Sequence, residues 1–201
     1  MDQTAWDERY AGPELVWGLG PNCFVAEELA ALPPGRAVDL GTGEGRNAIW
    51  LAERGFTVTA VDFSRVGLAR AAGLAAERGV SVDWVHADLL DYQPAPGRYD
   101  LVLIAYIQLP ADRLTALART AASALAPGGT LLAIGHDRDN LARGHGGPKD
   151  LSVLWTAETV TAGLGGLTVQ QACQVDRTVG TPDGDRTAID TLVRATRRAP
   201  A

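Results

Sequence analysis

Glycines and carboxylates gather at the ends of three stretches that are expected to be strands. The segment 41–45 (GTGEG) follows the apolar run 37–40, Asp62 ends the next β-branched run, and Asp88 follows the third. Glycines let the backbone bend sharply and let a ligand approach without interference from a Cβ atom. Carboxylates accept hydrogen bonds from hydroxyl and amino groups. The set therefore indicates a site for a nucleoside cofactor.

The glycine spacing bears on which cofactor would bind. The dinucleotide fingerprint is GxGxxG, but Arg46 takes the place of its third glycine and the spacing is GxGxG. A carboxylate at Asp62 suits the two hydroxyls of an adenosine ribose and disfavours a 2′-phosphate, which argues against NADP. NAD remains an alternative.

Strands and helices alternate over the first two-thirds of the chain. We expect strands at 37–40, 57–61, 81–86, 99–104 and 130–134, and helices at 46–54, 65–78 (capped by Ser64) and 111–126. Such alternation predicts an α/β fold with a mostly parallel sheet and right-handed crossovers. Ligands bind at the carboxyl ends of strands in sheets of this kind.

The two ends of the chain follow other patterns. Residues 167–175 and 187–196 alternate like strands on either side of GTPDGD, which predicts an antiparallel hairpin at one edge of the sheet. A helix is expected around 21–32. Residues 136–155 are rich in Gly, Asp and Arg and have the length of a lid, and long loops in compact domains are usually functional or mobile.

Composition limits the class of protein. A chain of 201 residues with 46% hydrophobic and 21% charged residues predicts one globular domain. The net charge of −6 argues against a nucleic-acid partner. No secretory signal or membrane-spanning run is visible, so we expect a cytoplasmic protein. Cys23 and Cys173 are expected to be buried thiols, and no metal site is expected.

On these residues the chain resembles the class I S-adenosylmethionine-dependent methyltransferases. The segments DLGTGEGR, VTAVDFS, ADLLDY and YDLVLIAY, followed by APGGTLL, match successive family motifs within residues 35–135. The resemblance implies a Rossmann-like three-layer sandwich, with a mostly parallel seven-stranded sheet closed by a C-terminal antiparallel hairpin. It also implies S-adenosyl-L-methionine as the cofactor.

The resemblance implies roles for individual residues. Asp39 would support the glycine loop and the amino group of the cofactor, Asp62 would hold the ribose hydroxyls, and Ala105 would lie beside the donor methyl. The residues of these motifs implied to bind the cofactor are Asp39, Gly41, Thr42, Gly43, Gly45, Arg46, Asp62, Phe63, Ser64, Ala87, Asp88, Leu89 and Ala105.

The N-terminal segment WDERY…LVWGLGPN resembles the tellurite-resistance and thiopurine methyltransferase branch, in which an aromatic helix folds over the cofactor. Trp6, Tyr10 and Trp17 would then form a lid; the alternative is ordinary packing of an N-terminal helix. Residues 1–35 would be the helical lid segment of a single domain, 35–135 its cofactor-binding core, and 136–201 the acceptor-side loop, helix and closing hairpin.

The acceptor side carries weaker signals. Residues 105–108 read AYIQ, which lacks the (N/D)PP(Y/F) element of amino-nucleobase methyltransferases. A metal-dependent catechol-type site would need an acid there, although the later Asp139-Asn140 pair is present. His136 follows the fifth strand and could take a proton, because histidine exchanges protons near neutral pH. Tyr106 could shape the acceptor pocket.

The sequence therefore predicts an S-adenosylmethionine-dependent methyltransferase that acts by in-line transfer on a small molecule. Family likeness favours a soft sulfur, selenium or tellurium nucleophile over other small heteroatom nucleophiles. Two alternatives remain: an NAD-dependent oxidoreductase on a similar fold, and a non-catalytic S-adenosylmethionine-binding protein. The sequence does not indicate an oligomeric state.

Overall fold

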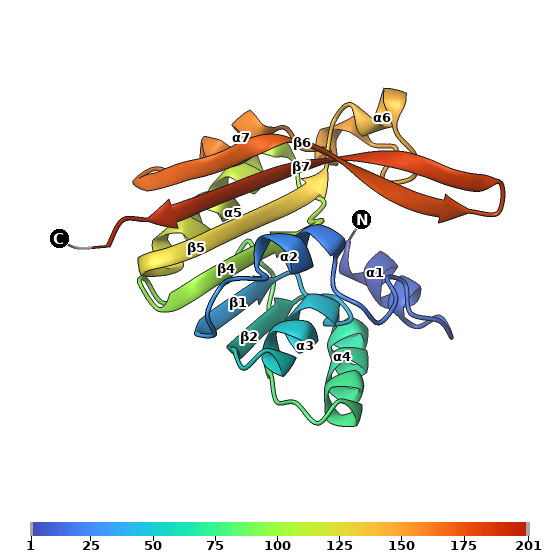
Figure 1. Cartoon of the computed structure of the whole chain (residues 1–201). Helices are drawn as coiled ribbons and strands as arrows, with labels where there is room; N and C mark the ends of the chain where they lie inside the picture. Colours follow the sequence, from blue (N-terminus) through green and yellow to red (C-terminus); the bar gives the residue numbers. More distant parts are fainter. Residues whose placement is uncertain (1, 200–201) are drawn as a thin grey trace.

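A twisted seven-stranded sheet forms the centre of the computed structural model, which describes residues 2–199 (Figure 1). The strand order is β3-β2-β1-β4-β5-β7-β6. The strands are β1 (Arg36–Leu40), β2 (Thr57–Asp62), β3 (Asp83–His86), β4 (Tyr99–Ala105), β5 (Leu125–His136), β6 (Leu167–Thr181) and β7 (Gly184–Arg197). Strands β1 to β5 pair in parallel, whereas β7 is antiparallel to both β5 and β6. The predicted parallel sheet with a closing C-terminal hairpin is confirmed.

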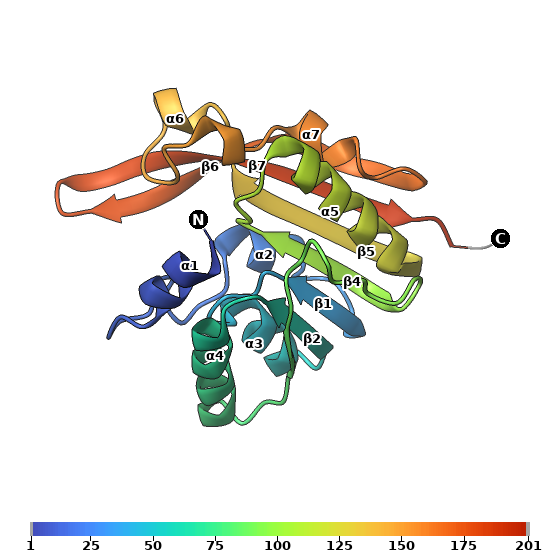
Figure 2. The ribbon, with the colours of Figure 1, turned by 180° about the vertical axis from the view of Figure 1, so that it is seen from behind.

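Helices cover both faces of the sheet, as Figures 1 and 2 show from opposite sides. They are α1 (Gln3–Tyr10), α2 (Cys23–Glu28), α3 (Arg46–Glu53), α4 (Arg65–Glu77), α5 (Ala111–Ala124), α6 (Asn140–Arg143) and α7 (Ala157–Thr161), with a 3-10 turn at Leu151–Val153. Buried side chains of α2 and α3 pack on one face, and those of α5 and α7 on the other. The sheet is therefore the middle of three layers.

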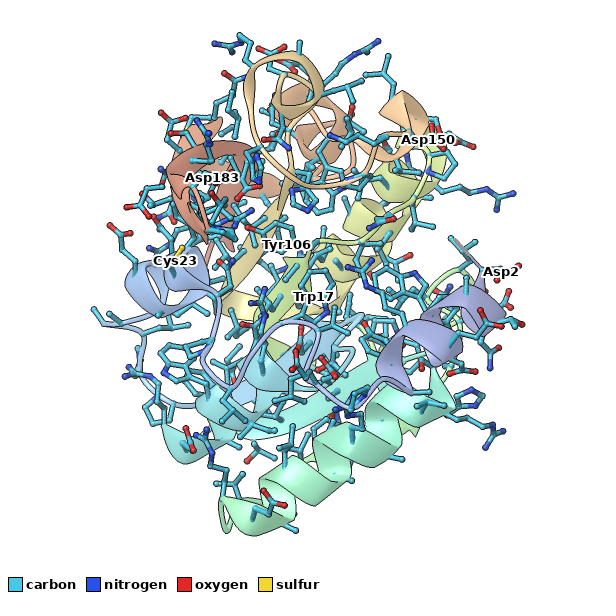
Figure 3. The ribbon with its side chains drawn as sticks, turned by 90° about the vertical axis from the view of Figure 1, so that its right-hand side faces the viewer. Asp2, Trp17, Cys23, Tyr106, Asp150 and Asp183 are labelled. Atoms are coloured by element: carbon cyan, nitrogen blue, oxygen red, sulfur yellow. The ribbon has the colours of Figure 1, made fainter. Side chains whose placement is uncertain are left out.

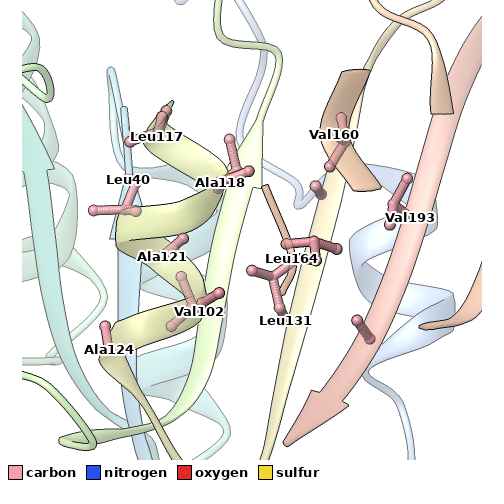
Figure 4. Packing of buried hydrophobic residues seen from close by; sticks show 14 of the residues in the cluster. Leu40, Val102, Leu117, Ala118, Ala121, Ala124, Leu131, Val160, Leu164 and Val193 are labelled. Atoms are coloured by element: carbon pink, nitrogen blue, oxygen red, sulfur yellow. The ribbon is translucent and has the colours of Figure 1, made fainter. Parts of the chain in front are cut away.

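The central strand β4 shows why its sequence is apolar throughout. Val102 packs toward α5 (Figure 4), and Ile104 belongs to the same cluster. Leu101 and Leu103 belong to the cluster on the opposite face. All four side chains are fully buried. Successive side chains of a strand point to opposite faces, so a strand covered on both sides needs an unbroken apolar run.

Several predicted boundaries differ from the structure: β3 begins at Asp83 rather than at 81, and α2 covers only Cys23–Glu28 of the expected 21–32. The helix expected over 111–126 ends at Ala124, and β5 begins at Leu125, before the Pro-Gly-Gly turn at 127–129. Leu125 pairs with Tyr99, and the register then shifts before Leu101, so the ladder continues past the turn residues. The hairpin strands are also longer than predicted, and only Pro182 and Asp183 separate them.

The hairpin β6–β7 continues beyond the end of β5 as a two-stranded ribbon, which projects to the right in Figure 1. The last residue of β5, His136, pairs with Asp190 of β7. The hairpin therefore brings its own side chains to the carboxyl end of the parallel strands.

The prediction of two buried thiols is wrong for Cys23, which is exposed at the first residue of α2, while Cys173 is partly exposed. The reason is that Cys23 begins a short helix beside an opening rather than within the core. In residues 2–199 no helix is long and apolar enough to cross a membrane.

Candidate cofactor and acceptor site

A cavity of about 280 Å³ lies at the carboxyl ends of the central strands. Figure 3 shows Trp17, Cys23 and Tyr106, three of the residues around it. The lining residues are Trp6, Tyr10, Trp17, Pro21, Asn22, Cys23, Gly41, Thr42, Gly43, Arg46, Asn47, Asp62, Phe63, Asp88, Leu89, Ala105, Tyr106, Ile107, Gln108, Leu109, His136 and Arg177. Most of the residues predicted from the sequence are thus brought together.

Four predicted cofactor residues do not line the cavity, and they support the loops around it. Asp39 accepts a hydrogen bond from the Thr42 hydroxyl beneath the glycine loop. Gly45 precedes α3, and a Cβ atom there would collide with side chains of α4 and β3. Ser64 caps α4, and the amide of Ala87 donates to the carbonyl oxygen of Asp62.

The glycine loop is shaped for close approach. Gly41 has φ +80° and Gly43 has φ +56°, a region that side chains rarely adopt. A Cβ atom on Gly41 would collide with the adjacent Ile107 side chain, and one on Gly43 would lie 2.5 Å from the Tyr10 hydroxyl. This cradle, which any side chain would fill, fits the predicted nucleoside cofactor.

Asp62 serves both the loop and the cavity. Its Oδ2 accepts from the amide of Gly43 at 2.8 Å, and its Oδ1 accepts from the amide of Ser64 at 2.8 Å. Burial raises the pKa of Asp62, while these amide hydrogen bonds oppose the change. The carboxylate also lines the cavity, where its remaining lone pairs suit ribose hydroxyls.

Asp39 is the most deeply buried acid beneath the loop. Its Oδ2 is 2.7 Å from the Thr42 hydroxyl, and its Oδ1 has no hydrogen-bond partner among the described residues. Burial raises the pKa of Asp39 to about 6. A buried carboxylate oxygen without a partner favours a nearby positive group, such as the amino group of the predicted cofactor.

We expect the Asp39→Asn variant to flatten the pH dependence of folding. Since the carboxyl has a pKa of about 6 when folded and 3.8 ordinarily, the folded chain holds a proton between these values that the unfolded chain has lost. Asp39 should therefore contribute a loss of stability, of up to about 3 kcal/mol, as pH rises from about 4 to about 6, and the variant should lack this contribution. Urea unfolding at pH 4.5 and at pH 7 gives the free energy of unfolding of both proteins. The same change between the two pH values in Asp39→Asn and in the wild type would contradict the prediction.

The N-terminal aromatic residues gather over the glycine loop. The rings of Trp6 and Tyr10 stack with centroids 5.4 Å apart, and the Trp6 and Trp17 centroids are 6.3 Å apart. The Arg9 guanidinium lies within 5.3 Å of both tryptophan ring centroids. All three aromatic side chains line the cavity, so the predicted lid candidates are neighbours in space.

A polar network lies on the side of the cavity that is expected to hold the methyl acceptor. The Tyr106 hydroxyl donates to Asp190 Oδ2 at 2.7 Å and accepts from Asn22 Nδ2 at 3.1 Å. Arg177 Nε donates to the same Asp190 oxygen at 2.7 Å. His136 Nδ1 lies 3.2 Å from Asp190 Oδ1, and neither atom has a hydrogen-bond partner elsewhere among the described residues. One buried carboxylate thus contacts three side chains of the cavity.

Asp190 remains a carboxylate in this network. Burial alone would raise its pKa, but contacts from His136, Arg177 and Tyr106 outweigh it and lower the pKa. Tyr106 has φ +58°, and it is the only non-glycine residue with positive φ among residues 2–199. Strained backbone of this kind is typical of functional sites. The ring of His136 packs edge-on against Tyr106 at 4.8 Å between centroids.

Sequence patterns did not reveal Asn22, Arg177 or Asp190. Arg177 and Asp190 lie on opposite strands of the hairpin, without a local motif, and only the pairing of β5 with β7 places them at the cavity. A signal for Asn22 exists in the run PNCF, because asparagine is a favoured N-cap residue. Its side chain accepts from the amides of Phe24 and Val25 at the start of α2.

The Asp139-Asn140 pair does not line the cavity. Asn140 is buried, where its Oδ1 accepts from the amide of Ile189 and its Nδ2 donates to the carbonyl oxygen of Gly146. Asp139 pairs with Arg143 at 2.7 Å. These contacts fold the 136–150 loop onto β7 and do not resemble a catechol-type metal site.

The comparisons agree with this geometry. Residues 37–129 match the family model described as a methyltransferase domain. The chain is 38% identical over 131 residues to the ribosomal protein L11 methyltransferase of Pelotomaculum thermopropionicum, covering 61% of this chain and 41% of that one. It is 28% identical over 121 residues to the 2-heptyl-1-hydroxyquinolin-4(1H)-one methyltransferase of Mycobacteroides abscessus, covering 59% of this chain and 53% of that one. It thus spans about half or less of these relatives.

Three solved structures share the fold over nearly the whole chain. One comes from work on the conversion of a disulfide bond into a thioacetal group during echinomycin biosynthesis (23% identity, TM-score 0.77, covering 99% of this chain and 93% of that one). A second is the N-methyltransferase NodS from Bradyrhizobium japonicum with S-adenosyl-L-homocysteine (19% identity, TM-score 0.73, covering 97% of this chain and 97% of that one). The third is TehB from Haemophilus influenzae (15% identity, TM-score 0.72, covering 98% of this chain and 67% of that one).

The fold and the glycine loop therefore define the class of S-adenosylmethionine-dependent methyltransferase folds. The comparisons support S-adenosyl-L-methionine as the predicted cofactor, because the NodS structure with this fold contains S-adenosyl-L-homocysteine. This likeness favours S-adenosylmethionine over the NAD alternative that the glycine spacing alone left open.

Proposed function

We propose that this protein transfers the methyl group of S-adenosylmethionine to a small molecule with a soft, thiol-like nucleophile, and that His136 accepts its proton. The observation that carries the proposal is that His136, backed by Asp190, lines the same cavity as the glycine loop. The division into a lid over 1–35, a core over 35–135 and an acceptor side over 136–201 is part of it.

The residues of the chain have separate tasks in this reaction. Bound S-adenosylmethionine supplies a methyl group on a positively charged sulfur, so the protein needs mainly to align the nucleophile and exclude water. Asp62 and the glycine loop would hold the nucleoside. Nε2 of His136 would take the proton from the acceptor, since Nδ1 faces Asp190. The acceptor would then form its new bond to carbon as a thiolate-like anion.

Two arguments support a soft acceptor. An ordinary cysteine-type thiol has a pKa nearer to neutrality than an alcohol, so one histidine is a sufficient base. The fold likeness to TehB gives weak support to the tellurite-resistance and thiopurine branch, and the structure from the thioacetal work is named for sulfur chemistry of that protein. Fold likeness alone is a weak basis for assigning a substrate, so the acceptor must be tested directly.

The test is transfer of a tritiated methyl group to a panel of acceptors. Small thiols, selenite and tellurite represent soft nucleophiles, and phenols and amines represent harder ones. Ribosomal protein L11 is included because a relative is named for it. We expect label on the soft group. Label on phenols, amines or L11 alone would overturn the acceptor class. Saturable cofactor binding without transfer to any acceptor would support the non-catalytic alternative instead.

A further inference from the structure

The carboxylate of Glu44 lies inside the glycine loop but turns away from the cavity. The residue is only 3% exposed and is absent from the cavity lining. Its Oε2 accepts from the amide of Val16 at 2.9 Å, and its Oε1 lies 3.1 Å from Nη1 of Arg70. The loop that cradles the cofactor is therefore tied directly to the N-terminal segment.

Arg70, on α4, holds the same segment through its backbone. Its Nη1 donates to the carbonyl oxygens of Tyr10, Gly12 and Glu14 at 2.7, 3.0 and 3.1 Å. Its Nη2 reaches the carbonyl oxygen of Pro13 at 3.4 Å. Hydrogen bonds from a charged guanidinium are stronger than neutral ones. One side chain thus fixes the path of the chain just after α1.

The Tyr10 ring fits between two glycines. A Cβ atom on Gly43 of the cofactor loop would meet the Tyr10 hydroxyl. A Cβ atom on Gly67, in the first turn of α4, would lie 3.0 Å from the Tyr10 ring and 3.1 Å from the carbonyl oxygen of Gly43. Gly67 has an ordinary helical conformation, so space rather than backbone strain limits this position.

A third contact joins helix α1 to Ser64, the N-cap residue of α4. The Ser64 hydroxyl donates to Asp7 Oδ1 at 2.5 Å, and this bond lowers the pKa of Asp7. The amide of Val66 approaches the same oxygen at 3.4 Å. Helix α1 is thus joined to the start of α4, while Arg70 and Glu44 join the residues that follow it.

We propose that Glu44 and Arg70 are positioning residues for cofactor retention. They form a clasp that fixes residues 10–17 over the cavity, so that Tyr10 and Trp17 close it and cofactor release requires the clasp to open. Because Glu44 belongs to the glycine loop, a cofactor that orders this loop also strengthens the clasp. The proposal rests on the cofactor alone and is independent of the proposed acceptor.

The test measures dissociation of S-adenosylhomocysteine, which requires no methyl transfer. In Arg70→Gln and Glu44→Gln we expect dissociation about tenfold faster than in the wild type, which is about 1.4 kcal/mol. Stopped-flow displacement gives the rate, and hydrogen exchange of the amides in residues 10–17, with ligand bound, reports the segment. The proposal would be overturned by folded variants in which hydrogen exchange of residues 10–17 is faster but S-adenosylhomocysteine still dissociates at the wild-type rate.

Two glycines of α4 supply a matched pair. Gly67→Ala should displace Tyr10 and speed dissociation, whereas Gly73→Ala should not, because nothing lies within 4 Å of a Cβ atom at Gly73. Both changes replace glycine by a better helix former, so neither should lower helix stability intrinsically. Equal dissociation rates in the two variants, both with native unfolding temperatures, would refute a role of Tyr10 placement in retention.

Discussion

Asp62→Ala is expected to weaken binding of S-adenosylmethionine and S-adenosylhomocysteine by about 100-fold or more. The change removes the carboxylate that would bind the ribose and leaves the amides of Gly43 and Ser64 without their acceptor. A hydrogen bond to a charged group contributes about 1.5–3 kcal/mol, two ribose hydroxyls would lose theirs, and 1.4 kcal/mol is a factor of ten in affinity. The unpaired amides lower stability both with and without ligand. Isothermal titration calorimetry with S-adenosylhomocysteine measures the loss.

Two control variants separate ligand binding from loop support. Asp62→Asn retains one acceptor oxygen for an amide, so its loss should be smaller than that of Asp62→Ala. Asp88→Ala removes an exposed carboxylate at the cavity rim and should cost about tenfold or less. Native circular dichroism with wild-type affinity in Asp62→Ala would show that Asp62 does not hold the ribose.

His136→Ala is expected to lower the rate of methyl transfer by about 10²- to 10⁴-fold, the usual range for loss of a general base. Affinity for S-adenosylhomocysteine should stay within about twofold, because the glycine loop and Asp62 are untouched. The measurement is the transfer rate at saturating cofactor with the best acceptor from the panel. A fully active His136→Ala enzyme would mean that the acceptor arrives already ionised.

Asp190→Asn tests whether the buried carboxylate acts through His136. Asp190 Oδ1 lies 3.2 Å from His136 Nδ1 and would hold the ring with Nε2 toward the acceptor, so its loss should lower the rate of methyl transfer while affinity for S-adenosylhomocysteine stays within about twofold. The other groups facing His136 and Asp190 are Arg177 from β6 and Tyr106 after β4. Tyr106→Phe keeps the ring and leaves the contact between Asp190 and His136 in place, so its transfer rate should fall less than that of Asp190→Asn.

The cofactor half of the site could be predicted because its signals are local. The run Gly41–Gly45 fixes a tight turn within a few residues, Asp62 ends β2, and Asp88 lies two residues after β3. The carboxyl ends of parallel strands lie at one edge of a sheet, so residues at or just after these strand ends must lie close together there. The fold, the loop and most lining residues follow from this reasoning.

The sequence by itself thus determined the α/β alternation, the glycine turn and the carboxylates that follow the strands, since these depend on backbone preferences over a few residues. Tertiary structure decided the rest. His136 meets Asp190 only through the register of β5 against β7, and a shift by one residue would turn Asp190 to the other face. Likewise, Glu44 meets Arg70 only because α1, α4 and the glycine loop pack together. Such contacts join residues distant in sequence, and no local pattern encodes them.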